Sequence, residues 1–139
     1  MEISSSGKAI ARLQQILPGM IIKDKVDVGT VVEHNTGRYF VMFKREYYRN
    51  FKYHFPELKK DNDKSFGWAQ IMSMSLLNWA CSNNIAWIVF ITPDGKAYRC
   101  SAQKFKDYVE LYGTEVPHLK GEVAMPLDYF DNLEKWKKE

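Results

Sequence analysis

The chain has 139 residues, a net charge of +3 and a composition that is 45% hydrophobic and 14% aromatic. This length fits a single domain over residues 1–139, and the apolar content argues against an intrinsically disordered chain. Because no apolar stretch approaches the roughly 20 residues of a membrane span, and the N-terminus lacks the apolar core of a signal peptide, we expect a cytoplasmic protein without a membrane partner.

The first predicted element is a short amphipathic helix over residues 7–17. Ile10, Leu13 and Leu17 recur at helical spacing and form its apolar face. The serines at positions 4–6 offer an N-cap, and Pro18-Gly19 ends the helix. We interpret this helix as a packing element that leads into a strand beginning near residue 20.

A β-hairpin is predicted next. Residues 26–33 and 38–43 are two apolar runs rich in β-branched and aromatic side chains, and they flank the turn sequence His34-Asn35-Thr36-Gly37. If Asn35 and Thr36 are the two turn residues, the two runs pair as antiparallel strands, and every opposed pair of residues is fixed.

This register decides which charged side chains meet. It places Glu33 opposite Arg38, and Asp27 opposite Lys44, with directly opposed Cβ atoms about 4.5–5.5 Å apart. A change of one residue in the turn would pair Asp27 with Arg45 instead. By strand alternation, the side chains expected on one face are those of Lys25, Asp27, Met42, Lys44 and Glu46.

A basic and aromatic segment, residues 44–55, follows this hairpin. Residues 38–60 hold seven Lys or Arg and two Glu, a balance of +5, whereas the rest of the chain sums to −2. Aromatic rings stack on bases while basic side chains meet phosphates, so this segment predicts a nucleic-acid surface. The alternative is that its rings fill the core. The candidate nucleic-acid contacts here are Arg45, Tyr48, Arg49 and Lys52.

Residues 66–82 form the most apolar long segment, and its length favours a buried helix over a strand. Gln70 is a candidate to contact nucleic acid or orient water, or else it faces a helix boundary. The cysteines, Cys81 and Cys100, stand in no Cys/His cluster, so the sequence favours two free thiols over a zinc site.

The C-terminal third alternates strands and helices. Residues 85–91 predict a strand buried on both faces, and a turn at residues 93–95, where Asp94 is a turn residue, leads to a second strand over residues 96–100. Ser101 is expected to cap a helix that ends before Gly113. Pro126 is expected to start a final helix.

The order of helix, strand, hairpin with Asp and then Lys, long helix and buried strand resembles the core of the PD-(D/E)XK nuclease superfamily, which includes Holliday-junction resolvases and restriction enzymes. The resemblance covers residues 7–100, with Val26-Asp27 in place of the first motif and Met42-Phe43-Lys44 in place of Glu-X-Lys. It implies an α/β fold of the restriction-endonuclease type, in which helices flank a mixed central sheet.

The resemblance also implies a DNA endonuclease dependent on Mg²⁺ or Mn²⁺, with Asp27 as a metal ligand and Lys44 as a charge stabiliser. Met42 departs from the motif, because a thioether cannot replace the family's glutamate. Glu46 is the first candidate for the missing carboxylate as catalytic and metal-binding residue, and Glu33 or Asp24 is the alternative if the register differs.

Two other functions stay open at this point. The chain can keep the nuclease fold and bind nucleic acid without cutting it, which Met42 favours. It can also be a protein-interaction domain whose aromatic segment forms core or interface. A homodimer is a further expectation from the resemblance, because small members of the superfamily commonly pair.

Overall fold

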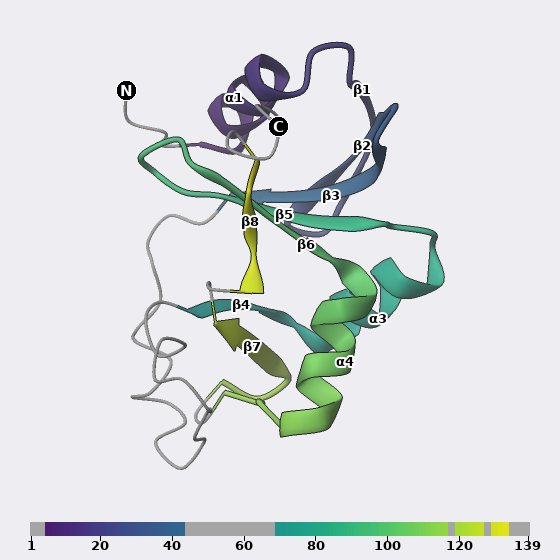
Figure 1. The fold of residues 1–139 in the computed structure, drawn as a ribbon, viewed down its shortest axis with the longest axis vertical. Helices are drawn as coiled ribbons and strands as arrows, with labels where there is room; N and C mark the ends of the chain where they lie inside the picture. The colour runs from purple at the N-terminus through teal and green to yellow at the C-terminus, as the bar shows by residue number, and fades with distance from the viewer. Residues whose placement is uncertain (1–4, 44–68, 117–118, 127–128, 134–139) are drawn as a thin grey trace.

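The computed structural model describes residues 5–43, 69–116, 119–126 and 129–133 (Figure 1). Its centre is a six-stranded mixed sheet in the order β1-β2-β3-β5-β6-β8. The strands are β1 (Ile21–Val26), β2 (Gly29–His34), β3 (Gly37–Phe43), β5 (Trp87–Ile91), β6 (Ala97–Ser101) and β8 (Asp131–Asn132). A separate two-stranded sheet pairs β4 (Ala69–Ser73) with β7 (Glu122–Pro126).

Helices and the small sheet cover the two faces of the central sheet. The helix α1 (Ser6–Ile16) lies on one face, whereas α3 (Met74–Ser82), α4 (Ala102–Tyr112) and the β4–β7 pair lie on the other (Figure 1). The predicted mixed α/β class is therefore confirmed. None of the helices in the described residues is both long and apolar enough to cross a membrane.

Strand alternation divides the core into two clusters. On the α1 side, Tyr39 and Val41 of β3 pack with Leu13 of the helix. On the opposite side, Phe40 and Met42 of the same strand pack with residues of α3, α4 and the small sheet. Successive side chains of β3 therefore point to opposite faces of the sheet. Since directly paired residues of neighbouring strands point to the same face, the pairing shows which face a residue of β1 or β2 occupies.

The β2–β3 hairpin has the register that its turn predicted. Glu33 pairs with Arg38 and Gly29 pairs with Met42, so Asn35 and Thr36 are the turn residues. The alternative register, longer by one residue, is excluded. Packing favours glycine at position 29, because a Cβ atom there would overlap the Phe40 ring.

The segment before this hairpin differs from the prediction. Residues 26–33 are not one strand, because Asp27 and Val28 form a tight turn that joins β1 to β2, with Val26 paired to Gly29. Asp27 adopts a positive φ of 54°, a conformation that Asp tolerates better than most residues. The prediction that Asp27 lies in a continuous strand, opposite Lys44, is therefore wrong for Asp27, which is a turn residue.

The central and C-terminal elements follow the sequence signals closely. β5 pairs with β3 in parallel and with β6 in antiparallel orientation, and residues Ile88 to Ile91 are buried, as expected of a strand covered on both faces. Ser101 caps α4 by accepting a hydrogen bond from the Lys104 backbone N–H. Gly113 ends the helix in the left-handed conformation.

Two predicted helices are wrong in part. Within the apolar segment, residues 69–73 form strand β4, and the helix starts only at Met74, because the backbone of residues 69–73 pairs with β7. Ile71 and Met72 are both buried, so the apolar pattern has no periodicity that would distinguish a strand from a helix here. Pro126 ends strand β7 instead of starting a helix, and residues 131–132 pair with β6.

Candidate functional site

The predicted catalytic residues fall partly within the described part of the chain. Asp27 is exposed in the β1–β2 turn, at the end of the sheet where β3 finishes at Phe43. Met42, in the position of the family's glutamate, is 2% exposed and belongs to the hydrophobic core. Lys44 and Glu46 lie outside the described residues.

Of the predicted common face, the described residues Lys25 and Met42 lie on different sides of the sheet. Lys25 pairs with Thr30, which pairs with Val41, so Lys25 lies on the α1 side of the sheet. Met42 lies on the opposite side. The prediction continued the strand of residues 26–33 back to Lys25, whereas the turn at residues 27–28 reverses the chain between Lys25 and β2.

A β-bulge in β1 determines which charges reach the α1 side. The register with β2 shifts between Ile22, which pairs with Val32, and Asp24, which pairs with Val31. An extra residue in one strand changes the alternation of the side chains that follow it. Ile22 and Lys25 therefore share the α1 face, whereas regular alternation from Ile22 would have placed Asp24 there.

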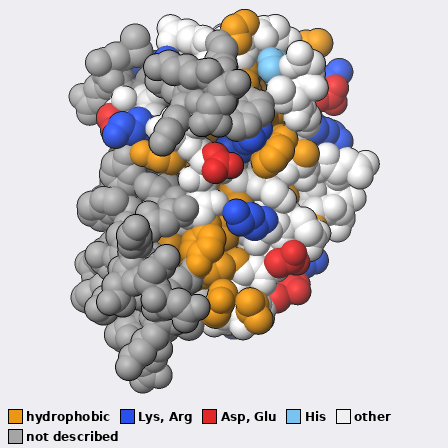
Figure 2. Space-filling model, viewed as in Figure 1, with side chains coloured by type: hydrophobic (Ala, Val, Ile, Leu, Met, Phe, Trp, Pro, Cys, Tyr) orange, Lys and Arg blue, Asp and Glu red, His pale blue; other side chains and the backbone are white. Residues whose placement is uncertain are grey.

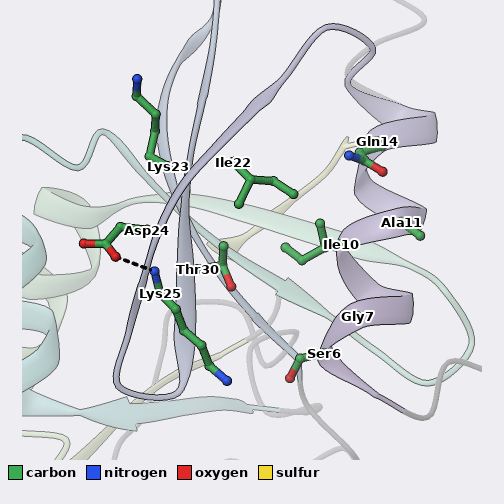
Figure 3. A pocket seen from close by; sticks show the side chains of 10 residues that line it. All are labelled: Ser6, Gly7, Ile10, Ala11, Gln14, Ile22, Lys23, Asp24, Lys25 and Thr30. Atoms are coloured by element: carbon green, nitrogen blue, oxygen red, sulfur yellow. Dashed lines mark hydrogen bonds between the residues drawn. The ribbon is translucent and has the colours of Figure 1, made fainter.

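Between α1 and β1 there is an open groove of about 680 Å³ (Figure 3). Ile10 and Ile22 extend into the space from the helix and the strand, and Thr30 of β2 also lines it (Figure 3). Lys25 extends towards the end of the groove where Ser6 begins the helix (Figure 3). The groove thus combines an apolar middle with a cationic and hydroxyl-bearing end.

Two other charged residues, Lys23 and Asp24, border this groove, but their charged groups are directed away from it. The Lys23 ammonium is 3.9 Å from the carboxylate of Glu33, and Glu33 follows Val32 in β2 and so faces away from α1. The Asp24 carboxylate accepts a hydrogen bond from the Lys25 backbone N–H and points away from α1 in Figure 3. Lys25 is therefore the ionic side chain of β1 that faces α1.

A smaller hollow joins the groove to the end of β3. It shares Ser6, Ile10, Lys25 and Thr30 with the groove, and Phe43 also lines it. Phe43 is the last residue of β3, and the chain continues from there into the basic and aromatic residues 44–55. The groove and the start of the basic segment are therefore neighbours.

The predicted nucleic-acid contacts Arg45, Tyr48, Arg49 and Lys52 lie outside the described residues. Gln70 is described and lies in β4, paired with Met125. It is 1% exposed, and neither atom of its amide has a hydrogen-bond partner within the described structure. A buried amide in this state is rare in folded proteins, but its burial separates it from the α1–β1 groove.

A polar network crosses the α1 side of the sheet at the β2–β3 turn. His34 bonds to the Thr36 hydroxyl at 2.8 Å, and this hydroxyl bonds to Tyr39 Oη at 2.7 Å. Arg99 donates from Nη1 to the same phenol oxygen at 3.2 Å, and its guanidinium lies 3.7 Å from the centre of the Trp87 ring. The network holds β2, β3, β5 and β6 together, and we assign it a structural role.

Cysteine and metal chemistry have little support in the described residues. Both cysteines are free, and burial raises the pKa of Cys100 to about 12 and raises that of Cys81. Since the thiolate is the reactive form, neither thiol is activated as a nucleophile. In this part of the chain, no three His, Cys, Asp or Glu side chains gather closely enough to bind one metal ion.

Hydrophobic side chains also gather on the face shown in Figure 2, over the lower part of the molecule where α4 and β7 lie. Tyr108 contacts both Tyr112 and Tyr129, with ring centres 4.7 and 5.0 Å apart. Leu111 is 74% exposed at the end of the same helix. This aromatic cluster lies on the opposite side of the central sheet from the α1–β1 groove.

Comparison with known proteins gives no relative. A scan against protein-family models, a search of curated proteins and a search of solved structures each found no match.

Sequence reasoning missed the groove because it depends on the bulge in β1. The sequence predicts that Ile22 and Lys25 lie in extended chain, but no local signal marks the position of the β-bulge between them. The only clue in the sequence is the alternating stretch Lys23-Asp24-Lys25, because a shift of one residue decides whether a lysine or the aspartate faces α1.

Proposed function

We propose that this protein is a nucleic-acid-binding domain on a scaffold that resembles the PD-(D/E)XK nucleases. The order of elements supports the proposal: a helix precedes three antiparallel strands, and a later strand, β5, adds to β3 in parallel after α3. Burial of Met42 favours binding over catalysis, because the motif position that should carry a carboxylate belongs to the core.

The proposal rests mainly on one observation. The strand β3 ends at Phe43 beside Lys25 and the start of α1, and the next residues begin the basic, ring-rich segment. Lys25 therefore adds to a local excess of positive charge that the sequence places directly after β3. Phosphate backbones are attracted to such a surface without regard to sequence.

Binding is tested by fluorescence anisotropy with labelled single-stranded and duplex DNA at several salt concentrations. We expect affinity to fall steeply with salt, and Arg45→Ala, Arg49→Ala and Lys52→Ala each to weaken binding. Lys106→Ala is the control, because it removes one positive charge from α4, which lies on the side of the central sheet opposite α1. No retention of either DNA at low salt would refute the proposed function.

The second candidate is metal-dependent DNA cleavage. It would use Asp27 as a metal ligand, Lys44 as a charge stabiliser, Glu46 as the second carboxylate and Mg²⁺ or Mn²⁺ as the ion. The exposed Asp27 carboxylate favours it, because the β1–β2 turn lies at the end of the sheet where β3 leads to Lys44. The described residues alone do not supply the oxygen ligands that such an ion needs.

Cleavage is tested on linear, nicked and branched DNA with and without divalent metal. Asp27→Asn is the informative variant, because Asn also tolerates the positive φ of this turn and only the charge is removed. Asp24→Asn in the neighbouring strand is the control. Activity lost in Asp27→Asn and kept in Asp24→Asn would establish the nuclease, and intact DNA in every condition would exclude it.

A further inference from the structure

The α1–β1 groove carries a more specific inference, which rests on the proposed nucleic-acid function. We infer that this groove binds a segment of single-stranded nucleic acid, with Lys25 and the start of α1 at a phosphate and with Ile10 and Ile22 against a base or sugar.

The charge of the groove selects an anion. The bulge in β1 brings Lys25 to the α1 face and turns Asp24 to the other face. The first turn of α1 holds no acidic residue, and Ser6 and Thr30 line the same hollow as Lys25, whose ammonium extends towards Ser6 (Figure 3). A lysine, two hydroxyls and the positive end of a helix together form an environment suited to phosphate.

The apolar residues select the form of the nucleic acid. Ile22 is 50% exposed at the edge of the groove, and Ile10 faces it from α1 (Figure 3). In a duplex the base faces are stacked inside, whereas a single strand can place a base or sugar against such side chains. A volume of about 680 Å³ lies within the range of pockets for drug-sized ligands, which suits one or two nucleotides rather than a double helix.

Continuity with the basic segment favours a strand over a free nucleotide. The hollow lined by Lys25, Thr30 and Phe43 extends the groove to the residue after which the basic segment begins. In the sequence, the two basic residues Lys44 and Arg45 follow Phe43 directly. A strand carries further phosphates that such cations can attract, whereas a mononucleotide does not.

The test compares neighbouring residues of β1. Lys25→Gln and Ile22→Ser change side chains that share the α1 face. Lys23→Gln removes the same charge from the rim of the groove, where the Lys23 ammonium lies 3.9 Å from the Glu33 carboxylate. Ile21→Ser makes the second change at a residue paired with Glu33, on the other face. The full chain is titrated against a labelled twelve-nucleotide oligothymidine by fluorescence anisotropy, with thermal melting to confirm that all four variants are folded.

We expect Lys25→Gln to weaken binding about tenfold and to lower the slope of log affinity against log salt by about 0.7, the value for one phosphate contact on a single strand. Ile22→Ser should weaken binding about fivefold without changing that slope, as expected for the loss of part of a base contact. Lys23→Gln and Ile21→Ser should stay within about twofold of the unmodified protein.

Three results would overturn the inference, and the first two would leave the proposed function standing. Equal losses in Lys25→Gln and Lys23→Gln would show binding by overall charge alone, with the proposed function intact. Competition by thymidine monophosphate as strong as by the oligonucleotide would make the groove a nucleotide site instead of a strand site. Failure of the unmodified protein to bind any nucleic acid would end both proposals.

Discussion

The edge strand β1 and the β2–β3 hairpin next to it differ in the regularity of their pairing and in their burial. The hairpin is regular, its pairs run without interruption from Gly29–Met42 to His34–Gly37, and most of its side chains are buried. β1 contains a register shift, and five of its six residues are exposed. The two regions share a ladder of hydrogen bonds, but only the hairpin contributes substantially to the core.

This difference separates stability from function. A buried, regular strand cannot change its side chains without cost to the core. An exposed edge strand can, and its bulge also protects the edge against pairing with other chains. We therefore expect substitutions in the hairpin to reduce stability, and substitutions in β1 to change binding with little effect on stability.

The largest effect is expected for Met42→Glu, which restores the glutamate of the nuclease motif at a core position. Burying an unpaired carboxylate should cost about 3 kcal/mol or more in the free energy of unfolding, measured with urea at pH 8. Burial would raise the pKa of the new acid, so the cost should decrease as the pH is lowered and the neutral form is reached.

Met42→Leu is the control for this substitution and should cost less than about 1.5 kcal/mol, because it keeps an apolar side chain of similar volume. Unchanged stability of Met42→Glu at pH 8 would mean that the position reaches solvent. Metal-dependent cleavage gained by the same variant would then revive the nuclease as the leading function.

Gly29→Ala should have the next largest effect. The added Cβ atom would overlap the Phe40 ring, which is fully buried and has little room to move. Overpacking of this kind costs about 1–3 kcal/mol, measured as a lower urea midpoint at an unchanged slope. Gly7→Ala in α1 is the control, since a methyl group added there would meet no heavy atom within 4 Å, and it should be neutral or stabilising. An equal response of both variants would contradict the described hairpin packing.

A smaller loss is expected for Tyr39→Phe, which keeps the ring and removes the hydroxyl shared by Thr36 and Arg99. The change should cost about 1 kcal/mol, the usual net value of an internal hydrogen bond. Thermal unfolding checks it, and the double variant Tyr39→Phe/Thr36→Val should cost less than the sum of the two single changes because the partners are linked. Full additivity would argue against the network.

The smallest effect is expected in β1. Lys23→Gln removes an exposed ion pair with Glu33, whose charged atoms are 3.9 Å apart, and should change the free energy of unfolding by less than about 0.5 kcal/mol in urea. A loss comparable to that of Gly29→Ala would show that β1 stabilises the sheet far more than its exposure indicates.

The same contrast explains how much of the fold could be predicted from the sequence. Local signals were sufficient where a turn or cap fixes the chain: the register set by Asn35-Thr36, the Ser101 cap and the Gly113 end of α4 were all predicted and are confirmed. The turn at Asp27-Val28 was missed because neither residue is glycine and the surrounding residues continue a β-branched run.

The remaining errors have a tertiary cause. Residues 69–73 form a strand because β7, about fifty residues later in the chain, pairs with them. The candidate groove could not be predicted for a similar reason, since the face of Lys25 depends on a bulge that the sequence does not mark. The predicted roles of Lys44, Glu46 and the basic segment remain predictions, because these residues lie outside the described ranges.

Strand binding in the α1–β1 groove is tested most directly by a two-dimensional amide NMR titration of the full chain with the twelve-nucleotide oligothymidine. We expect the largest shifts at Gly7, Lys25 and Thr30 around the groove, with small shifts at Leu111 and Tyr112 at the end of α4. Saturable binding that shifts the α4 amides and leaves those three unchanged would contradict binding in the groove.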